Sequence, residues 1–110
     1  MKEKIIIDKM LRYLTKVVEY CQGYNYDQFV KDEKTTEACV FNLSQLGELC
    51  RTLDDDFMKI HSEIPWRAMY GLRNRIVHDY EGINLMLVWD VISEDLPELK
   101  KQLLELRENL

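Results

Sequence analysis

Arg73, Asn74 and His78 lie within six consecutive positions and are the residues best suited to chemistry in this chain. Histidine titrates near neutral pH and can move a proton. A guanidinium offers several N–H donors to phosphate oxygens as negative charge develops on them. Arginine and histidine without carboxylate ligands suit the cleavage of RNA phosphodiesters, where the substrate's own 2′-hydroxyl is the nucleophile and no metal is required. The plainer interpretation is an arginine in a structural ion pair and a histidine on the surface.

The spacing of these residues decides whether they can act together. If residues 65–80 form a helix, Arg73 points into the middle of an apolar stripe. An unpaired charge is costly there, so Arg73 needs an anion from the chain or an anionic ligand. His78 lies about 140° round the helix from Arg73. The two can meet if the helix unwinds near Val77, or if a two-fold axis brings two chains together. Asn74 shares a face with His78 and could orient the imidazole or hold a phosphate oxygen.

Charge is segregated along the chain. The net charge is −5 and the pI is about 5.0, so any nucleic-acid site must be local. The segment 65–80 contains Arg67, Arg73 and Arg75 against only Asp79, and we expect Arg67 and Arg75 to guide an RNA substrate.

Cofactor chemistry has no support in the sequence. The two histidines, His61 and His78, have no partner at the spacing of metal ligands, and no glycine-rich phosphate loop is present. We therefore expect neither a metal site nor a cofactor.

The pattern of apolar residues predicts helices and no strands. The 110 residues suit one domain, 1–110. We expect an all-α fold, an antiparallel up-and-down bundle of four or five helices, of a kind that often dimerises. Three- and four-residue steps of apolar residues predict its elements: a helix over about 4–22, a short piece through Val30 that Asn25 and Asp27 can cap, a helix after Thr36 to about Leu53, a helix from Pro65, and two final helices divided by Pro97 with Asp95 as the cap of the second. Gly47 is expected to let two helices approach closely.

The cysteines and the N-terminus bear on the compartment. Cys21, Cys39 and Cys50 are odd in number and form no C-x-x-C pair, which indicates buried, reduced thiols. The apolar triplet 5–7 is too short for a signal peptide or a membrane span. We expect a cytoplasmic protein that is not in a membrane.

The run from Arg73 to Tyr80, R-N-R-I-V-H-D-Y, resembles the signature of HEPN-domain ribonucleases. With a tyrosine two residues after the histidine, it is similar to the HepT toxins of HepT/MntA toxin–antitoxin pairs, and the likeness extends over most of the chain. The resemblance implies a homodimeric HEPN-like bundle. In it, Arg73, Asn74 and His78 of both subunits would line a cleft that cuts RNA, such as tRNA or mRNA, without a metal ion.

The same resemblance implies a protein partner. In that family a minimal nucleotidyltransferase, the MntA-like antitoxin, silences the toxin by transferring AMP to the tyrosine, here Tyr80. Adenylate beside the cleft would add bulk and negative charge where the RNA phosphate must lie. Two alternatives stay open. One is a non-catalytic helical module that binds a nucleotidyltransferase and its nucleotide or substrate, in which Arg73 only binds. The other is a purely structural dimer.

Overall fold

The computed structural model describes residues 2–110, except for the side chain of Tyr80. These residues form helices and no strands: α1 (Lys2–Tyr20), α2 (Tyr26–Lys31), α3 (Glu33–Leu49), α4 (Asp55–Ile60), α5 (Trp66–His78), α6 (Leu85–Asp90) and α7 (Leu96–Glu108), with 3₁₀ turns η1 (Cys50–Thr52) and η2 (Tyr80–Gly82) and a π turn η3 (Val91–Asp95). The all-α prediction is confirmed. The described residues contain more helical segments than the four or five predicted.

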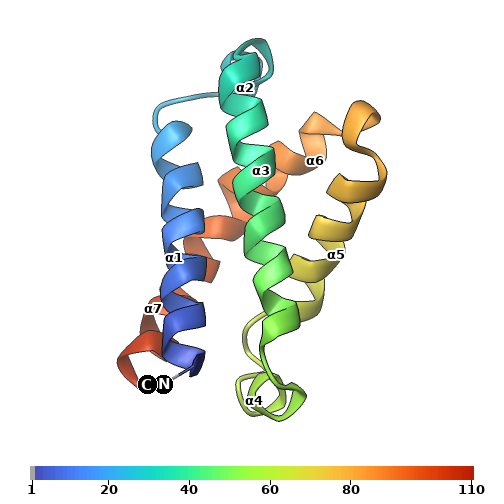
Figure 1. The fold of residues 1–110 in the computed structure, drawn as a ribbon. Helices are drawn as coiled ribbons and strands as arrows, with labels where there is room; N and C mark the ends of the chain where they lie inside the picture. The colour runs from blue at the N-terminus through green and yellow to red at the C-terminus, as the bar shows by residue number, and fades with distance from the viewer. Residues whose placement is uncertain (1) are drawn as a thin grey trace.

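The long helices run up and down (Figure 1). Helix α3 stands in the middle, with α1 on one side and α5 on the other, and α7 returns behind α1 so that the two ends of the chain lie together. The pairs α1–α3, α3–α5 and α1–α7 pack against one another. Helix α3 therefore connects the N-terminal half of the core to the helix that contains Arg73.

Periodic apolar residues of α1 form the centre of the core. Ile7, Met10, Leu14 and Val17 have no exposed surface, as expected for three- and four-residue steps on one helical face. The helix ends at Tyr20, slightly before the predicted end, and the chain turns at Gly23, whose φ of 78° suits glycine.

The starts of α2 and α3 depend on polar side chains. Asn25 forms the predicted cap of α2: its side chain accepts from the N–H of Gln28, and the Gln28 side chain accepts from the N–H of Asn25. Helix α3 begins earlier than predicted, at Glu33, because the Asp32 carboxylate accepts from the N–H and the hydroxyl of Thr35. Residues 33–36, which were expected to precede this helix, form its first turn.

The two final helices are present as α6 and α7, and Asp95 stands at the N-cap position of α7, as predicted. The prediction was wrong only in expecting the Asp95 side chain to cap α7, and the chain between the two helices stays helical. It continues through the π turn η3, where the N–H of Leu96 reaches back to the carbonyl of Val91, and the Asp95 side chain makes no capping bond. Pro97 lies in the first turn of α7, where its missing N–H costs little, so a π turn can join the two helices.

The acidic triplet 54–56 precedes and opens α4, a short helix that the apolar pattern did not show. Carboxylates are favourable at a helix start because the N–H groups there carry partial positive charge. Pro65 directly precedes α5, which begins at Trp66.

Gly47 makes the close helix contact that the sequence predicted. A Cβ built on Gly47 would lie 2.5 Å from the carbonyl oxygen of Met69 and 2.6 Å from the Cβ of Arg73. Glycine is thus required where α3 crosses α5, and the contact places Arg73 directly over α3.

All three cysteines are buried and free, as predicted, and the sulfurs of Cys21 and Cys39 are 3.4 Å apart between α1 and α3. Within residues 2–110, no helix combines the length and the apolar character needed to cross a membrane.

Candidate functional site

Arg73 lies on α5 where that helix meets α3, with only 23% of its side chain exposed. The neighbouring apolar residues Trp66, Met69 and Ile76 are buried. The anion that this position requires is Glu48 on α3, whose Oε2 lies 2.8 Å from Nε of Arg73. The sequence prediction named no partner for Arg73. The sequence did contain a clue to this partner, because Glu48 directly follows Gly47, the residue expected at a close helix contact.

Glu48 is shared by two arginines. Its Oε1 lies 3.2 Å from Nη1 of Arg51, in the 3₁₀ turn after α3. Its Oε2 makes the ion pair with Arg73 but no aligned hydrogen bond within the described residues, so the contact is electrostatic rather than a directed bond. One carboxylate between two guanidinium groups leaves this cluster with excess positive charge.

Two further side chains on α5 hold the guanidinium of Arg73. Its Nη1 donates to Oδ1 of Asn74 at 2.8 Å. Its central carbon lies 5.7 Å from the centre of the Tyr70 ring, at the distance of a cation–π contact. Among the described side chains, which do not include that of Tyr80, this is the hydrogen bond that the guanidinium makes, and a guanidinium has five N–H donors to offer. The group is a pre-oriented cation suited to phosphate.

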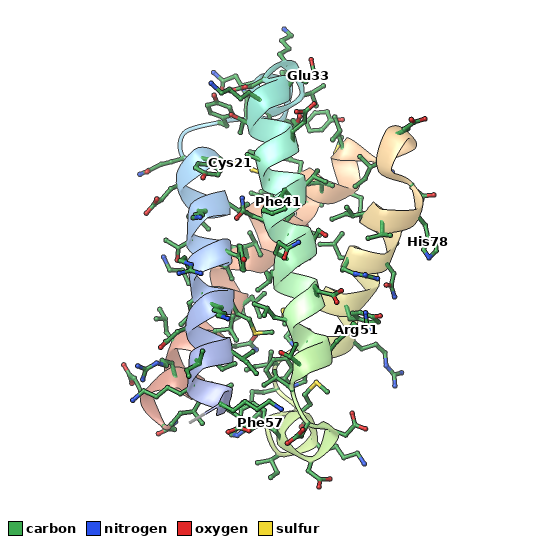
Figure 2. The ribbon with its side chains drawn as sticks, viewed as in Figure 1. Cys21, Glu33, Phe41, Arg51, Phe57 and His78 are labelled. Atoms are coloured by element: carbon green, nitrogen blue, oxygen red, sulfur yellow. The ribbon has the colours of Figure 1, made fainter. Side chains whose placement is uncertain are left out.

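His78 lies apart from this cluster. It is the last residue of α5, it is exposed, and Figure 2 shows its side chain at the outer edge of the molecule, pointing away from α3. The helix is regular up to this point, because the N–H of Asp79 bonds the carbonyl of Arg75 at 2.9 Å. The helix therefore does not unwind near Val77, and one chain keeps Arg73 and His78 on different faces.

The predicted link between Asn74 and His78 is not formed in the described part of the chain. The two share a face of α5, but the oxygen of Asn74 accepts from Arg73 instead. The structure thus brings Arg73 and Asn74 together, with Glu48 and Tyr70, and leaves His78 exposed at the end of α5.

The other predicted site residues are also on or near α5. Arg67 and Arg75 are exposed. Arg67 lies at the edge of an open pocket that Arg51 and Tyr70 also line. Tyr80 begins the 3₁₀ turn that follows α5, and its side chain lies outside the described residues.

Metal-ion chemistry and a cysteine nucleophile have little support near this site. Among residues 2–110, no three His, Cys, Asp or Glu side chains gather as a metal site would require. Burial raises the pKa of the Cys50 thiol to about 12. The thiol is therefore protonated at neutral pH and is not a nucleophile.

Comparisons with known proteins find a family and relatives that the chain resembles. A model of the family described as "Ribonuclease HepT-like" matches residues 10–106. The chain is 33% identical over 100 residues to a "putative RNase" of Caldanaerobacter subterraneus subsp. tengcongensis, covering 91% of this chain and 89% of that protein. It is 30% identical over 104 residues to the "probable ribonuclease HepT" of Thermococcus cleftensis, covering 94% of each. No solved structure matches the chain.

Proposed function

Because the chain belongs to the HepT-like ribonuclease family, we propose that it is an endoribonuclease that cleaves RNA without a metal ion. The observation that carries the proposal is the pre-oriented guanidinium of Arg73, held between Glu48, Asn74 and Tyr70. Such a group binds a phosphate in the ground state and stabilises it more strongly as charge develops.

The proposed reaction uses the substrate's 2′-hydroxyl. His78 takes the proton from this hydroxyl, and its oxygen attacks the neighbouring phosphorus. The bond from phosphorus to the 5′-oxygen breaks, and that oxygen receives a proton from an imidazolium. Arg73 holds the charged phosphoryl oxygens while the bonds change. The products are a cyclic 2′,3′-phosphate and a 5′-hydroxyl, and the histidine returns to its starting state.

Arg73 and His78 lie on different faces of α5, so the proposal places them in one site only across a two-fold axis. Exposed apolar side chains support such a contact. Phe41 is 58% exposed and Val77 is 50% exposed. Phe41 shares a face of α3 with Glu48, and Val77 shares a face of α5 with Arg73. The two apolar groups therefore flank the arginine cluster and could join two copies of the chain (Figure 2 shows Phe41 on α3).

A test of catalysis compares the two histidines of the chain. In His78→Ala, RNA cleavage should fall by about 100-fold or more, because a positioned acid–base group contributes about that much. His61→Ala is the matched control, since it removes the other imidazole but keeps the backbone carbonyl that Trp66 of α5 bonds, and it should cleave as the parent does. Cleavage should continue in excess chelator. Cleavage by His78→Ala at the parental rate would refute the role of this histidine.

A test of the two-chain site mixes two inactive variants. Arg73→Ala retains His78, and His78→Ala retains Arg73, so a mixed dimer has one complete site. In an equal mixture, half of the dimers are mixed, which predicts about a quarter of the parental activity. A mixture as inactive as its two components would show that the site is not shared in this way.

The toxin role and its control form the last part of the proposal. Tyr80 lies two residues after His78, directly after the end of α5. Transfer of AMP to its phenol by a partner nucleotidyltransferase would add bulk and negative charge beside the histidine and so block RNA. Co-expression with a nucleotidyltransferase encoded beside it should add the mass of AMP to the parent but not to Tyr80→Phe. A chain that cleaves no RNA with or without this modification would instead favour the non-catalytic binding module.

A further inference from the structure

An open pocket of about 990 Å³ lies beside the arginine cluster, between η1, α4 and the first turns of α5. Its walls are mainly apolar, and its volume is at the upper end of the range of small-ligand sites. Its apolar part includes Met58, Trp66 and Tyr70, and its polar part includes Arg51, Lys59 and Arg67. The pocket thus combines an apolar surface with cations, as sites for single-stranded nucleic acids do.

The apolar wall of the pocket is held in place by internal bonds. The indole N–H of Trp66 donates to the carbonyls of His61 at 3.0 Å and Met58 at 3.2 Å. The Trp66 ring also lies 6.3 Å from that of Phe57. The polar atom of the indole is therefore satisfied, and the buried ring, in a residue only 8% exposed, supports the apolar wall from within. Such a wall can accept a base by its face without reading its identity.

The charge of the pocket is opposite to that of the whole chain. Three cationic side chains, on Arg51, Lys59 and Arg67, share the lining with one carboxylate, on Asp55. The chain as a whole carries −5. A local excess of positive charge on an acidic protein favours an anionic ligand at this place.

Two side chains connect the pocket to Arg73. Tyr70 lines the pocket, and its ring centre lies 5.7 Å from the guanidinium carbon of Arg73. Arg51 also lines the pocket and contacts Glu48, which in turn contacts Arg73. A chain of phosphates that passes Arg73 can therefore continue along Arg51 into the pocket.

We propose that this pocket binds an unpaired nucleotide of single-stranded RNA next to the phosphate held by Arg73. The base lies against Tyr70 and the apolar wall, and the adjoining phosphates contact Lys59 and Arg67. This inference rests on the proposed function, since it names the form of RNA that the same site takes. The enzyme would accordingly prefer loops and single strands to duplexes, with little preference for the base in the pocket.

The experiment measures binding apart from cleavage. The probe is a labelled single-stranded RNA of mixed sequence with 2′-O-methyl groups throughout, which has no nucleophile, and binding is followed by fluorescence anisotropy at several salt concentrations. The charge variant is Lys59→Ala/Arg67→Ala. Its matched control, Lys16→Ala/Arg12→Ala, removes the same residue types from the exposed face of α1.

The charge variant should bind about 25-fold more weakly at 0.1 M salt, and the slope of log K against log salt should fall by about 0.7 for each phosphate that no longer has a cation beside it. The control should bind nearly as the parent does. Tyr70→Leu should weaken binding by about fivefold or more, because a base then has no aromatic ring on which to stack. Tyr13→Leu is the matched control for that change, since Tyr13 lies under Arg12 at 6.0 Å on α1.

Several results would overturn the inference. The first is equal weakening of binding in the charge variant and its α1 control, and the second is binding by Tyr70→Leu at the parental affinity. The third is a duplex probe bound as tightly as the single strand. The fourth is no RNA binding by the parent, which would leave the pocket to a protein partner. The inference and the proposed function fail separately. Binding that depends on Lys59 and Arg67 without cleavage of natural RNA contradicts only the function. Cleavage with unchanged binding in the charge variant contradicts only the pocket.

Discussion

Gly47 lies where α3 passes against the backbone of α5, and an alanine at this position tests the contact that places Arg73. The added Cβ would lie 2.5 Å from the carbonyl oxygen of Met69 and 2.6 Å from the Cβ of Arg73, whereas ordinary contacts begin at 3.4 Å. Neither atom can rotate away, because one is backbone and the other is the first carbon of its side chain. The two helices must therefore separate by roughly an ångström to accept a methyl group that a close-packed interior cannot absorb.

The magnitude follows from two opposing effects. Alanine favours a helix over glycine by about 1 kcal/mol. Overpacking a tight contact costs about 1–3 kcal/mol, and the upper end applies here because the neighbouring atoms cannot give. Gly47→Ala should therefore lower the free energy of unfolding by about 2 kcal/mol, which for a domain of this size lowers Tm by about 8 °C.

Gly71→Ala is the matched control, because Gly71 also lies within a helix but a Cβ there meets nothing within 4 Å. Gly71→Ala should gain the higher helix propensity of alanine without any overpacking cost, and so raise Tm by up to about 4 °C. Both variants are measured by thermal and urea unfolding, followed by circular dichroism at one protein concentration. Equal stabilisation by the two alanines would refute the close contact of α3 and α5, and with it the proposed placement of Arg73.

Three further predictions concern other parts of the fold. The hydrogen bond from Tyr24 is the main cause that lowers the pKa of Asp32 below its usual 3.8, so the ionised carboxylate stabilises the fold above pH 3.8 and this stabilisation is lost as the pH falls through the lowered pKa. In acid unfolding curves the parent should therefore lose its advantage over Asp32→Asn, and a constant difference in stability down to about pH 2 would contradict this. Asn84→Ala should lower the free energy of unfolding by about 1 kcal/mol, because the Asn84 side chain accepts from two N–H groups at the start of α6; urea unfolding at the parental midpoint would argue against this cap. Burial raises the pKa of Cys50 to about 12, so iodoacetamide at about pH 8 should alkylate Cys50 only after unfolding, and rapid labelling of the folded protein, read by peptide mass, would be inconsistent with a buried thiol.

The local features of the fold were largely predictable from the sequence. Apolar steps along α1 predicted its buried face, since a helix brings residues three and four apart to one side. Asn25 predicted the start of α2, because its side chain can reach the free N–H groups of the next turn. The π turn before Pro97 was not predictable in the same way. Local rules state only that proline disturbs a helix, and the packing of the whole segment decides how the disturbance is absorbed.

For the candidate site, the sequence by itself determined the residue types, the family and the need of Arg73 for an anion, because these depend on motif and helical period alone. Only the tertiary structure decided that the anion is Glu48 and that Asn74 accepts a hydrogen bond from Arg73 instead of contacting His78. It also decided that Tyr70 lies between the arginine cluster and a cationic pocket. The physical reason is distance along the chain. Glu48 and Arg73 are separated along the chain by η1 and α4. They meet only because Gly47 lets α3 and α5 cross closely enough for their side chains to touch.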